Sequence, residues 1–381
     1  MRIAVLGPSY PYRGGIAHYT ARLSQQVQAD GHDLLAVNLS RQYPSSLFPG
    51  TTQEDASERT FDVDAQRWLD TMNPASWLKT ARRIHHWDPD WVIVQWWHPY
   101  FAPSFGAVMG LLRGAGRRVA LVCHNVEPHE SSPVDRVLLK VAYAAPQRFL
   151  VHANTQADAM RIYRPGADIV VNPHPVYDQF GHDPLESDES EDDGSPSPAA
   201  ARQRLGLNGE RWILFFGLVR PYKGLDLLLQ AMPEIHERTG ARLLVAGECY
   251  GEEAPYHALA EGLGDAVRFE FRYVANEEVP DLMAASDVVV LPYRHATQSG
   301  VAQAAFGCGR AVISTRVGGI PDVVRHEETG LLVDPEDPSA IADAVEAFYV
   351  PGVRERLEAG VVADRAKNSW SALLGVLLAD R

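Results

Sequence analysis

The stretch "RWILFFGLVRPYKGLDLLLQAM", residues 211–232, contains the pattern that decides the fold. An apolar run typical of a strand buried on both faces ends at Gly217, and an amphipathic helix is predicted from about Leu225. The turn between them carries Arg220 and Lys223, three residues apart. An arginine fork and a lysine point charge at the carboxyl end of a strand suit a diphosphate group. The turn lacks the GxxxxGK[ST] pattern of a P-loop.

The alternative for Lys223 is an ordinary solvated side chain. The chain has only four lysines, so a lysine placed in this turn by chance is less expected. We therefore predict that Arg220 and Lys223 contact the phosphate oxygen atoms of a ligand.

Strand-like apolar runs alternate with helix-length segments along both halves of the chain. The runs are RIAVLG, DLLAVNL, DWVIVQW, RVALVCH and RFLVHA in the first half, and RWILFFG, ARLLVAGE, AVRFEFRY, DVVVLPY, AVISTR and GLLVD in the second. This alternation predicts an α/β fold with two doubly wound, Rossmann-like domains. Ligands of such sheets bind at the carboxyl ends of the strands, so we expect the site in a cleft between two facing domains.

The domain boundaries follow from the same pattern. We predict an N-terminal domain at residues 1–180, a linker at 181–201 and a C-terminal domain at 202–364. A C-terminal helix at about 365–381 is expected to pack back on the first domain. The linker is "GHDPLESDESEDDGSPSPAAA", in which seven of the eleven residues from Asp183 to Asp193 are acidic. Such a segment buries too little apolar surface to offset its ordering entropy, although a functional acidic tail is an alternative.

The composition narrows the class of protein. With 381 residues, 46% of them hydrophobic and 22% charged, the chain can fill two soluble cores. A net charge of −14 disfavours nucleic acid as a partner. The three cysteines lie far apart without a CxxC pair, as in a reducing compartment. No signal peptide and no apolar run of membrane-spanning length are recognised, so we predict a cytoplasmic protein.

Two further glycine turns precede predicted helices. Gly14 and Gly15 follow the first strand, and the stretch "ATQSGVAQAAFGCG", residues 296–309, runs through Ser299 and Gly300 into a helix. Free N–H groups at a helix start favour an anion, and glycine lets a ligand approach the backbone closely. The alternatives are a turn that needs positive φ at Gly14 and a tightly packed helix start at Gly300.

These motifs, in this order and spacing, resemble retaining glycosyltransferases of the GT-B fold and the GT4 type. The motifs that carry the resemblance are GG after the first strand, RPYKG after a central strand, and the later pattern SG…A…G.AVIST.VGGIP…TGLLV. It covers almost the whole chain. It implies a nucleotide-sugar donor bound mainly by the C-terminal domain, a sugar or lipid-linked sugar acceptor on the N-terminal side, and no metal or other cofactor.

The resemblance also implies roles for particular residues. His124, after the strand RVALVCH, matches a histidine that faces the donor sugar, although a histidine satisfied by loop carbonyls is an alternative. Tyr273 and Val274 match a segment whose backbone contacts the nucleobase. Backbone N–H groups near Ser299, Gly300 and Val301 are expected to hold the diphosphate, with Arg220 and Lys223 opposite.

The chain departs from the family pattern at two acidic positions. Alignment through GCG puts Ala296 and Ala304 where relatives carry two glutamates that contact the donor sugar and the ribose. Gln298 and Gln303 are expected to supply neutral hydrogen bonds instead. RPYKG together with QSG resembles a subgroup that makes both changes at once, which favours a retuned site over an inactive one.

The segment "NPASWLKTARRIHHW" combines aromatic side chains with a basic helical face. Lys79, Arg82 and Arg83 share that face beside Trp77, a pattern that suits peripheral contact with an anionic membrane. The alternative is that most of the tryptophans in the first half are core residues. The sequence thus predicts a metal-independent, retaining glycosyltransferase of polysaccharide or glycoconjugate synthesis. An inactive nucleotide-sugar-binding protein and a nucleotide-sugar 2-epimerase are the alternatives.

Overall fold

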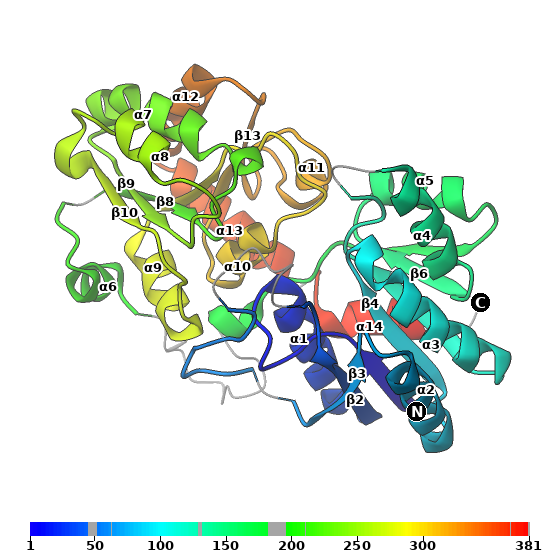
Figure 1. Ribbon diagram of the computed structural model, residues 1–381. Coiled ribbons are helices and arrows are strands. Elements are labelled where there is room, and N and C mark those ends of the chain that lie inside the picture. The colour runs from blue at the N-terminus through cyan, green and yellow to red at the C-terminus, as the bar shows by residue number, and fades with distance from the viewer. Residues whose placement is uncertain are drawn as a thin grey trace. The chain divides into compact units, whose positions relative to one another are not determined.

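The computed structural model describes residues 1–44, 52–61, 63–128, 132–181, 196–209, 211–365 and 367–379. The chain forms two compact units, each built on a parallel sheet covered by helices (Figure 1). Unit 1 comprises Met1–Ala56, Thr60–Pro173 and Trp370–Arg381, and unit 2 comprises Ser57–Arg59 and His174–Ser369. The predicted α/β class with two doubly wound sheets is confirmed.

Unit 1 contains a seven-stranded parallel sheet in the order β3-β2-β1-β4-β5-β6-β7. The strands are β1 (Arg2–Leu6), β2 (Asp33–Arg41), β3 (Ala65–Asp70), β4 (Trp91–Trp96), β5 (Arg118–Cys123), β6 (Arg148–Val151) and β7 (Asp168–Val171). The helices are α1 (Gly15–Ala29), α2 (Pro74–Trp87), η2 (Pro99–Phe101), α3 (Ala102–Gly114), α4 (Pro133–Tyr143), α5 (Asn154–Tyr163) and α14 (Trp370–Leu378). The central strands β4, β5 and β6 are buried almost throughout, which explains their uninterrupted apolar runs.

Unit 2 contains a six-stranded parallel sheet in the order β10-β9-β8-β11-β12-β13. The strands are β8 (Trp212–Phe216), β9 (Arg242–Ala246), β10 (Val267–Glu270), β11 (Val288–Leu291), β12 (Val312–Thr315) and β13 (Gly330–Val333). The longer helices are α6 (Pro198–Leu205), α7 (Leu225–Thr239), α8 (Ala254–Leu259), α9 (Val279–Ala285), α10 (Gly300–Gly307), α11 (Ile320–Val323), α12 (Pro338–Phe348) and α13 (Val353–Arg365). Single 3₁₀ turns lie at η3 (Asp178–Phe180), η4 (Pro221–Lys223), η5 (Gly264–Ala266) and η6 (Asn276–Glu278).

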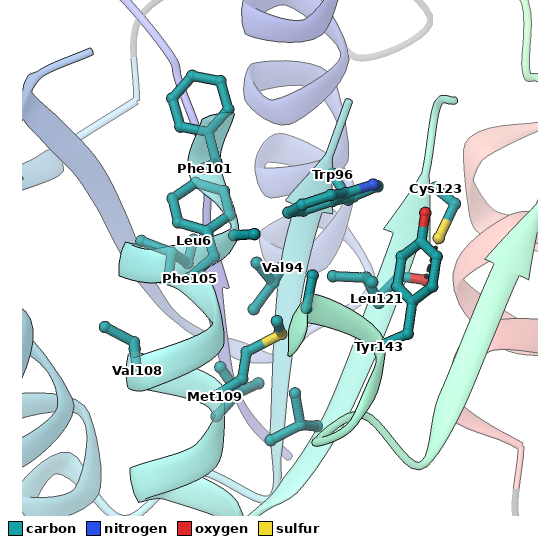
Figure 2. Packing of buried hydrophobic residues seen from close by; sticks show 14 of the residues in the cluster. Leu6, Val94, Trp96, Phe101, Phe105, Val108, Met109, Leu121, Cys123 and Tyr143 are labelled. Carbon is teal, nitrogen blue, oxygen red and sulfur yellow. Dashed lines mark hydrogen bonds between the residues drawn. The ribbon is translucent and has the colours of Figure 1, made fainter. Parts of the chain in front are cut away.

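The core of unit 1 settles part of the tryptophan question. Figure 2 shows Phe101, Phe105 and Met109 from η2 and α3 packed against Val94 and its neighbours on β4. Trp96 belongs to the same cluster and is fully buried. The partly buried tryptophans Trp68, Trp77, Trp87 and Trp97 pack against the edge of this cluster. Most of the aromatic side chains in the first half are therefore core or core-edge residues.

The boundary between the units lies earlier than the sequence pattern predicted. Unit 2 begins at His174, whereas we placed the end of the first domain at residue 180. The reason is that residues 174–181 pack on α10: the Tyr177 N–H donates to the Gln303 carbonyl at 3.2 Å. A Cβ on Gly307 would lie 2.0 Å from the Tyr177 carbonyl oxygen, so the two backbones touch.

The predicted linker, residues 181–201, extends too far at its C-terminal end, because α6 begins at Pro198. Residues 182–195, which include the acidic run, lie outside the described residues. Residues 198–201 belong to α6, whose first turn is capped by the Ser197 hydroxyl and begins with Pro198. Proline at the first helical position and serine before it are a standard helix start.

The C-terminal helix α14 belongs to unit 1 and starts at Trp370, a little later than about 365. The Trp370 ring packs edge-on against Tyr19 of α1 at 4.8 Å. The Arg148 guanidinium donates to the carbonyls of Leu377 and Ala379, each at 2.7 Å. Residues from both ends of the sequence thus complete one core. Over the described part of the chain, no helix is long and apolar enough to span a lipid bilayer.

Candidate functional site

The candidate site lies at the carboxyl edge of the sheet in unit 2. Because all strands of this sheet are parallel, the turns that follow β8, β9, β10 and β11 gather at one edge. Gly217 directly follows β8 and has φ of +91°. A Cβ there would lie 3.0 Å from Val301 Cγ2 and 3.4 Å from Lys223 Nζ. The predicted residues Lys223 and Val301, distant in sequence, therefore meet beside this glycine.

Lys223 is a partly buried ammonium group. Its Nζ lies 5.7 Å from the centroid of the Tyr293 ring. Burial, and next the positive charge of Arg220, lower the pKa of Lys223 to about 8. Among the residues that the structure describes, no carboxylate contributes to that pKa. A cation held without an anionic partner favours a negatively charged ligand, because the ligand would restore the lost stabilisation.

Arg220 stands beside Lys223 at the start of η4. Its guanidinium carbon lies 4.7 Å from the centroid of the Tyr250 ring, which fixes the plane of the side chain. Its Nε atom is buried and has no hydrogen-bond partner among the described residues. Buried polar groups are almost always paired in native proteins, so an unpaired charged donor is expected where a ligand supplies the acceptor.

The start of α10 supplies a second set of donors. The Ser299 hydroxyl caps the helix by accepting from the Ala302 N–H at 3.2 Å, and it pairs with the Tyr293 hydroxyl at 3.2 Å. The N–H groups of Gly300 and Val301 lie in the first turn of α10, where backbone N–H groups have no intrahelical acceptor. The Val301 side chain and the Lys223 ammonium both lie beside Gly217, so these N–H groups belong to a helix turn close to Lys223. Gln298, in the same loop, is partly buried.

The start of α10 is tightly packed, and its role in binding an anion stays a prediction. A Cβ on Gly300 would lie 3.3 Å from Cε2 of Tyr177, so this glycine is needed for packing. The N–H groups of the first turn stand on the same helix end as the Ser299 cap. Ala304, where relatives carry a glutamate, is only 3% exposed. Ala296 is also buried, and its carbonyl oxygen would be 1.6 Å from a Cβ on Gly318.

Tyr273 and Val274 follow β10, the edge strand beside β9. Val274 is buried, and Tyr273 is partly buried with its carbonyl accepting from Arg272 at 3.3 Å. Arg272 also forks the carboxylate of Glu278, at 2.8 and 2.6 Å. Arg272 thus links this segment to Glu278. The segment lies at the same carboxyl edge of the sheet as the turn that carries Arg220 and Lys223.

Three predicted residues belong to unit 1. Gly14 has φ of +104° and precedes α1, and Gly15 is the first residue of that helix. His124 directly follows β5, and its Nε2 atom lies 2.9 Å from Oε1 of the fully buried Gln95. The edge of the Tyr19 ring packs on the imidazole at 4.6 Å. A buried amide and an aromatic ring therefore fix the orientation of His124.

Two residues of this site were not predicted: the Tyr250 ring lies beside Arg220, and the Tyr293 ring lies beside Lys223. The available signal was an aromatic residue soon after a buried strand, in "VAGECY" and "VVVLPY". Among the described residues, no cluster of three or more histidine, cysteine or acidic side chains is suited to hold a metal ion.

Comparison with known proteins identifies the family. The model for Glycosyltransferase Family 4 matches residues 13–180, and the model for Glycosyl transferases group 1 matches residues 210–349. The chain belongs to these GT4-type glycosyltransferases, as the resemblance predicted.

Relatives and solved structures agree with this assignment. A D-inositol 3-phosphate glycosyltransferase from Acidothermus cellulolyticus is 34% identical over 194 residues, which cover 47% of this chain and 43% of the relative. One from Catenulispora acidiphila is 29% identical over 304 residues, covering 74% and 70%. The match to the first of these relatives spans less than half of that relative's length.

Two solved structures share the fold. Sucrose-phosphate synthase from Thermosynechococcus elongatus has a TM-score of 0.74 at 20% identity, covering 99% of this chain and 97% of its own. HepE from Anabaena, in complex with UDP, has a TM-score of 0.72 at 16% identity, covering 98% of both chains. The predicted GT-B fold is confirmed.

Proposed function

We propose that unit 2 binds the diphosphate of a nucleotide-sugar and that the protein transfers the sugar, with retention, to a hydroxyl acceptor. The observation that carries this proposal is the pair Arg220 and Lys223, two partly buried cations without a carboxylate partner among the described residues. The turn that carries them begins at Gly217, and the side chain of Val301, from the first turn of α10, lies beside that glycine. A diphosphate matches both cations and the adjacent N–H donors.

The same groups suit catalysis. As the glycosidic bond of the donor breaks, negative charge grows on the leaving phosphate. Lys223, Arg220 and the N–H groups of Gly300 and Val301 stabilise that charge from fixed positions. Retention then follows from attack on the same face, with a leaving phosphate oxygen taking the acceptor's proton. His124, oriented by Gln95, hydrogen-bonds to the donor sugar, and Tyr273 and Val274 offer backbone contacts to the base. This chemistry needs no metal or other cofactor.

The solved relatives guide the choice of donor. HepE from Anabaena was crystallised with UDP, with UDP and glucose, and with UDP-glucose. UDP-sugars are therefore the first donors to test. The acceptor is a sugar or lipid-linked sugar hydroxyl, in polysaccharide or glycoconjugate synthesis.

Calorimetry with UDP, GDP, UDP-glucose and GDP-mannose, followed by an assay of donor hydrolysis, tests the proposal. Binding of one nucleotide together with slow release of free sugar is the expected result. Binding without release supports a non-catalytic nucleotide-sugar-binding protein, which the buried Ala296 and Ala304 would suit. Conversion of the sugar to its 2-epimer supports an epimerase. No binding by any of the four compounds contradicts all three functions.

We further propose that unit 1 makes peripheral contact with an anionic membrane at its cytoplasmic face. Helices α2, α3 and α4 lie side by side (Figure 1) and together contain six lysine and arginine residues against one acid. All six cations are exposed, in a chain of net charge −14: Lys79, Arg82, Arg83, Arg113, Arg136 and Lys140. Val134, Val137 and Val141 of α4 are also exposed, at 65%, 62% and 48%. Cations beside exposed apolar side chains suit a lipid surface.

Sedimentation with lipid vesicles tests this contact. The protein is expected to bind phosphatidylcholine vesicles only when they also contain phosphatidylglycerol. The double variant Lys79→Gln with Arg82→Gln should lose most of this binding, whereas Arg356→Gln, an exposed position in unit 2, should not. Equal binding by both variants contradicts the proposal.

A further inference from the structure

Arg294 stands in the loop "PYRHATQSG" before α10. Its guanidinium contacts three neighbouring residues. Nη1 and Nη2 donate to the two carboxylate oxygens of Asp226, at 2.7 and 2.8 Å. Nη1 also donates to the Pro221 carbonyl at 3.0 Å, and Nε lies 2.8 Å from a Glu336 oxygen. All three nitrogen atoms of the guanidinium have partners, so Arg294 has no pair of N–H donors available for a diphosphate.

The partners of Arg294 belong to the turn that carries the two cations. Pro221 is the first residue of η4, and Asp226 lies in the first turn of α7, so they flank Lys223 on both sides. Arg294 belongs to the loop between β11 and α10, which leads to the Ser299 cap. The guanidinium therefore joins the two donor-bearing segments of the site.

Backbone contacts join the same two segments. The Arg294 N–H donates to the Tyr222 carbonyl at 2.8 Å. A Cβ on Gly224 would lie 2.0 Å from the Pro292 carbonyl oxygen, so the chains touch there. These backbone contacts remain when the side chain is changed, so a variant at this position is expected to fold.

The ion pair has a geometry that fixes the relative orientation of its two side chains. The Arg294 and Asp226 side chains are 24% and 30% exposed, and their contact is bidentate. Burial alone would raise the pKa of the Asp226 carboxyl, but the hydrogen bonds and charge of Arg294 outweigh burial and lower that pKa. Forked arginine–carboxylate pairs fix orientation as well as distance.

We propose that Arg294 is a positioning residue that fastens the turn of Arg220 and Lys223 to the loop leading into α10. This inference rests on the proposed diphosphate site. Through this connection the cations and the first-turn N–H groups keep one spacing before the donor arrives. Binding then requires little rearrangement, and the rate depends on Arg294 although it does not touch the reacting atoms.

Two measurements on the full chain test the proposal, one of them independent of any donor. The first follows acylation of the Lys223 amine against pH by mass spectrometry. Lys223 faces Arg220 and the Tyr293 ring, and in the wild type its acylation rate should reach half of its maximum at about pH 8. In Arg294→Ala the turn should loosen and hydrate, which moves this midpoint upward, toward the ordinary value of 10.5.

The second measurement compares donor turnover. Arg294→Ala and Arg294→Lys should each lower kcat/KM roughly 10²-fold, mostly through kcat, because a small displacement of catalytic groups costs about that much. Asp226→Asn combined with Arg294→Ala should be little worse than either single change, since both break one contact. Lys in place of Arg should not rescue, because an ammonium cannot fork a carboxylate.

The matched control is Arg238→Ala. Arg238 also pairs with several carboxylates in unit 2, from Glu234, Asp343 and Glu346, but it lies at the far end of α7. Its loss should change neither the Lys223 midpoint nor kcat. The inference is overturned when Arg294→Ala matches Arg238→Ala in the acylation midpoint, or when the two changes at Arg294 and Asp226 act additively on kcat. If the wild type binds no nucleotide, the proposed function fails, while the acylation midpoint still decides the role of Arg294.

Discussion

The two sheets carry comparable glycine turns with different surroundings. In unit 1 the turn after β1 leads through Gly14 to α1, and β1 lies between β2 and β4. In unit 2 the turn after β8 leads through Gly224 to α7, and β8 lies between β9 and β11. A Cβ on Gly14 would meet nothing within 4 Å, whereas one on Gly224 would overlap the Pro292 carbonyl.

The different surroundings of the two turns show which features distinguish a candidate anion-binding site. Topology places both turns at the carboxyl end of a central strand, so topology alone cannot distinguish an anion site from a simple connection. The unit 2 turn adds Arg220 and Lys223, and a neighbouring loop encloses them. The side chains and the crowding, not the glycines, therefore mark the candidate diphosphate site.

Removing the charge from the crowded turn should have the largest effect. Lys223→Ala should lower kcat by about 10²–10³-fold, the cost of losing one donor that stabilises a developing oxyanion. Steady-state kinetics with the donor found by calorimetry measure this. The control is Lys367→Ala, at an exposed lysine of unit 2. An unchanged kcat in Lys223→Ala would refute the assignment of this site.

Adding a methyl group to each turn compares the two backbones directly. Gly224→Ala should lower the free energy of unfolding by about 3 kcal/mol, because φ of +69° is strained for alanine and its Cβ overlaps Pro292. Gly14→Ala should cost less, about 2 kcal/mol, from backbone strain alone, because φ of 104° with ψ of 168° is a conformation that glycine adopts almost exclusively. Urea denaturation measures both. Equal losses would mean that crowding does not distinguish the two turns.

The unit 2 turn should also give binding a pH dependence. The pKa of Lys223 is lowered to about 8, so the ammonium is present below that pH and lost above it. Affinity for a nucleoside diphosphate should fall roughly fivefold from pH 8 to 9, because binding must then take up a proton. Calorimetry at both pH values measures this change. Lys223→Arg keeps its charge over this range and should bind equally at both, and a wild type that does so too would contradict the prediction.

The smallest effect on stability is expected at the helix starts. Helix α10 has a side-chain cap from Ser299, whereas α1 begins after Gly14 and has none. Ser299→Ala should cost about 1 kcal/mol in the free energy of unfolding and weaken nucleotide binding only slightly. Ser299→Asp, which can cap but adds a negative charge, should retain stability and lose binding. Retained binding in the aspartate variant would place the phosphates away from α10.

The sequence predicted every strand of unit 2 but missed the two edge strands of unit 1. All six strands of unit 2 correspond to apolar runs that are recognisable in the sequence. In unit 1, β3 and β7 were missed, and both are edge strands with mostly part-exposed residues. These two strands are covered less completely, so their sequences lack the continuous apolar run.

The site was predicted in part, for a related physical reason. Single residues such as Lys223 and Ser299 carry local signals: a cation after a strand, a hydroxyl before a helix. The role of Arg294 depends on contacts with Pro221 and Asp226, more than sixty residues away, and no local pattern encodes them. The need for glycine at position 307 likewise has no local signal, because it arises from the close approach of the Tyr177 backbone.

The attachment of α14 to unit 1 has a consequence for biosynthesis. Trp370 packs on Tyr19, and Arg148 reaches the carbonyls of Leu377 and Ala379. These contacts are impossible until α14 has emerged from the ribosome, and every residue of unit 2 precedes α14 in the chain. Unit 1, although translated first, should therefore reach its native state last, with the ring surface of Tyr19 left open to chaperones in the interval.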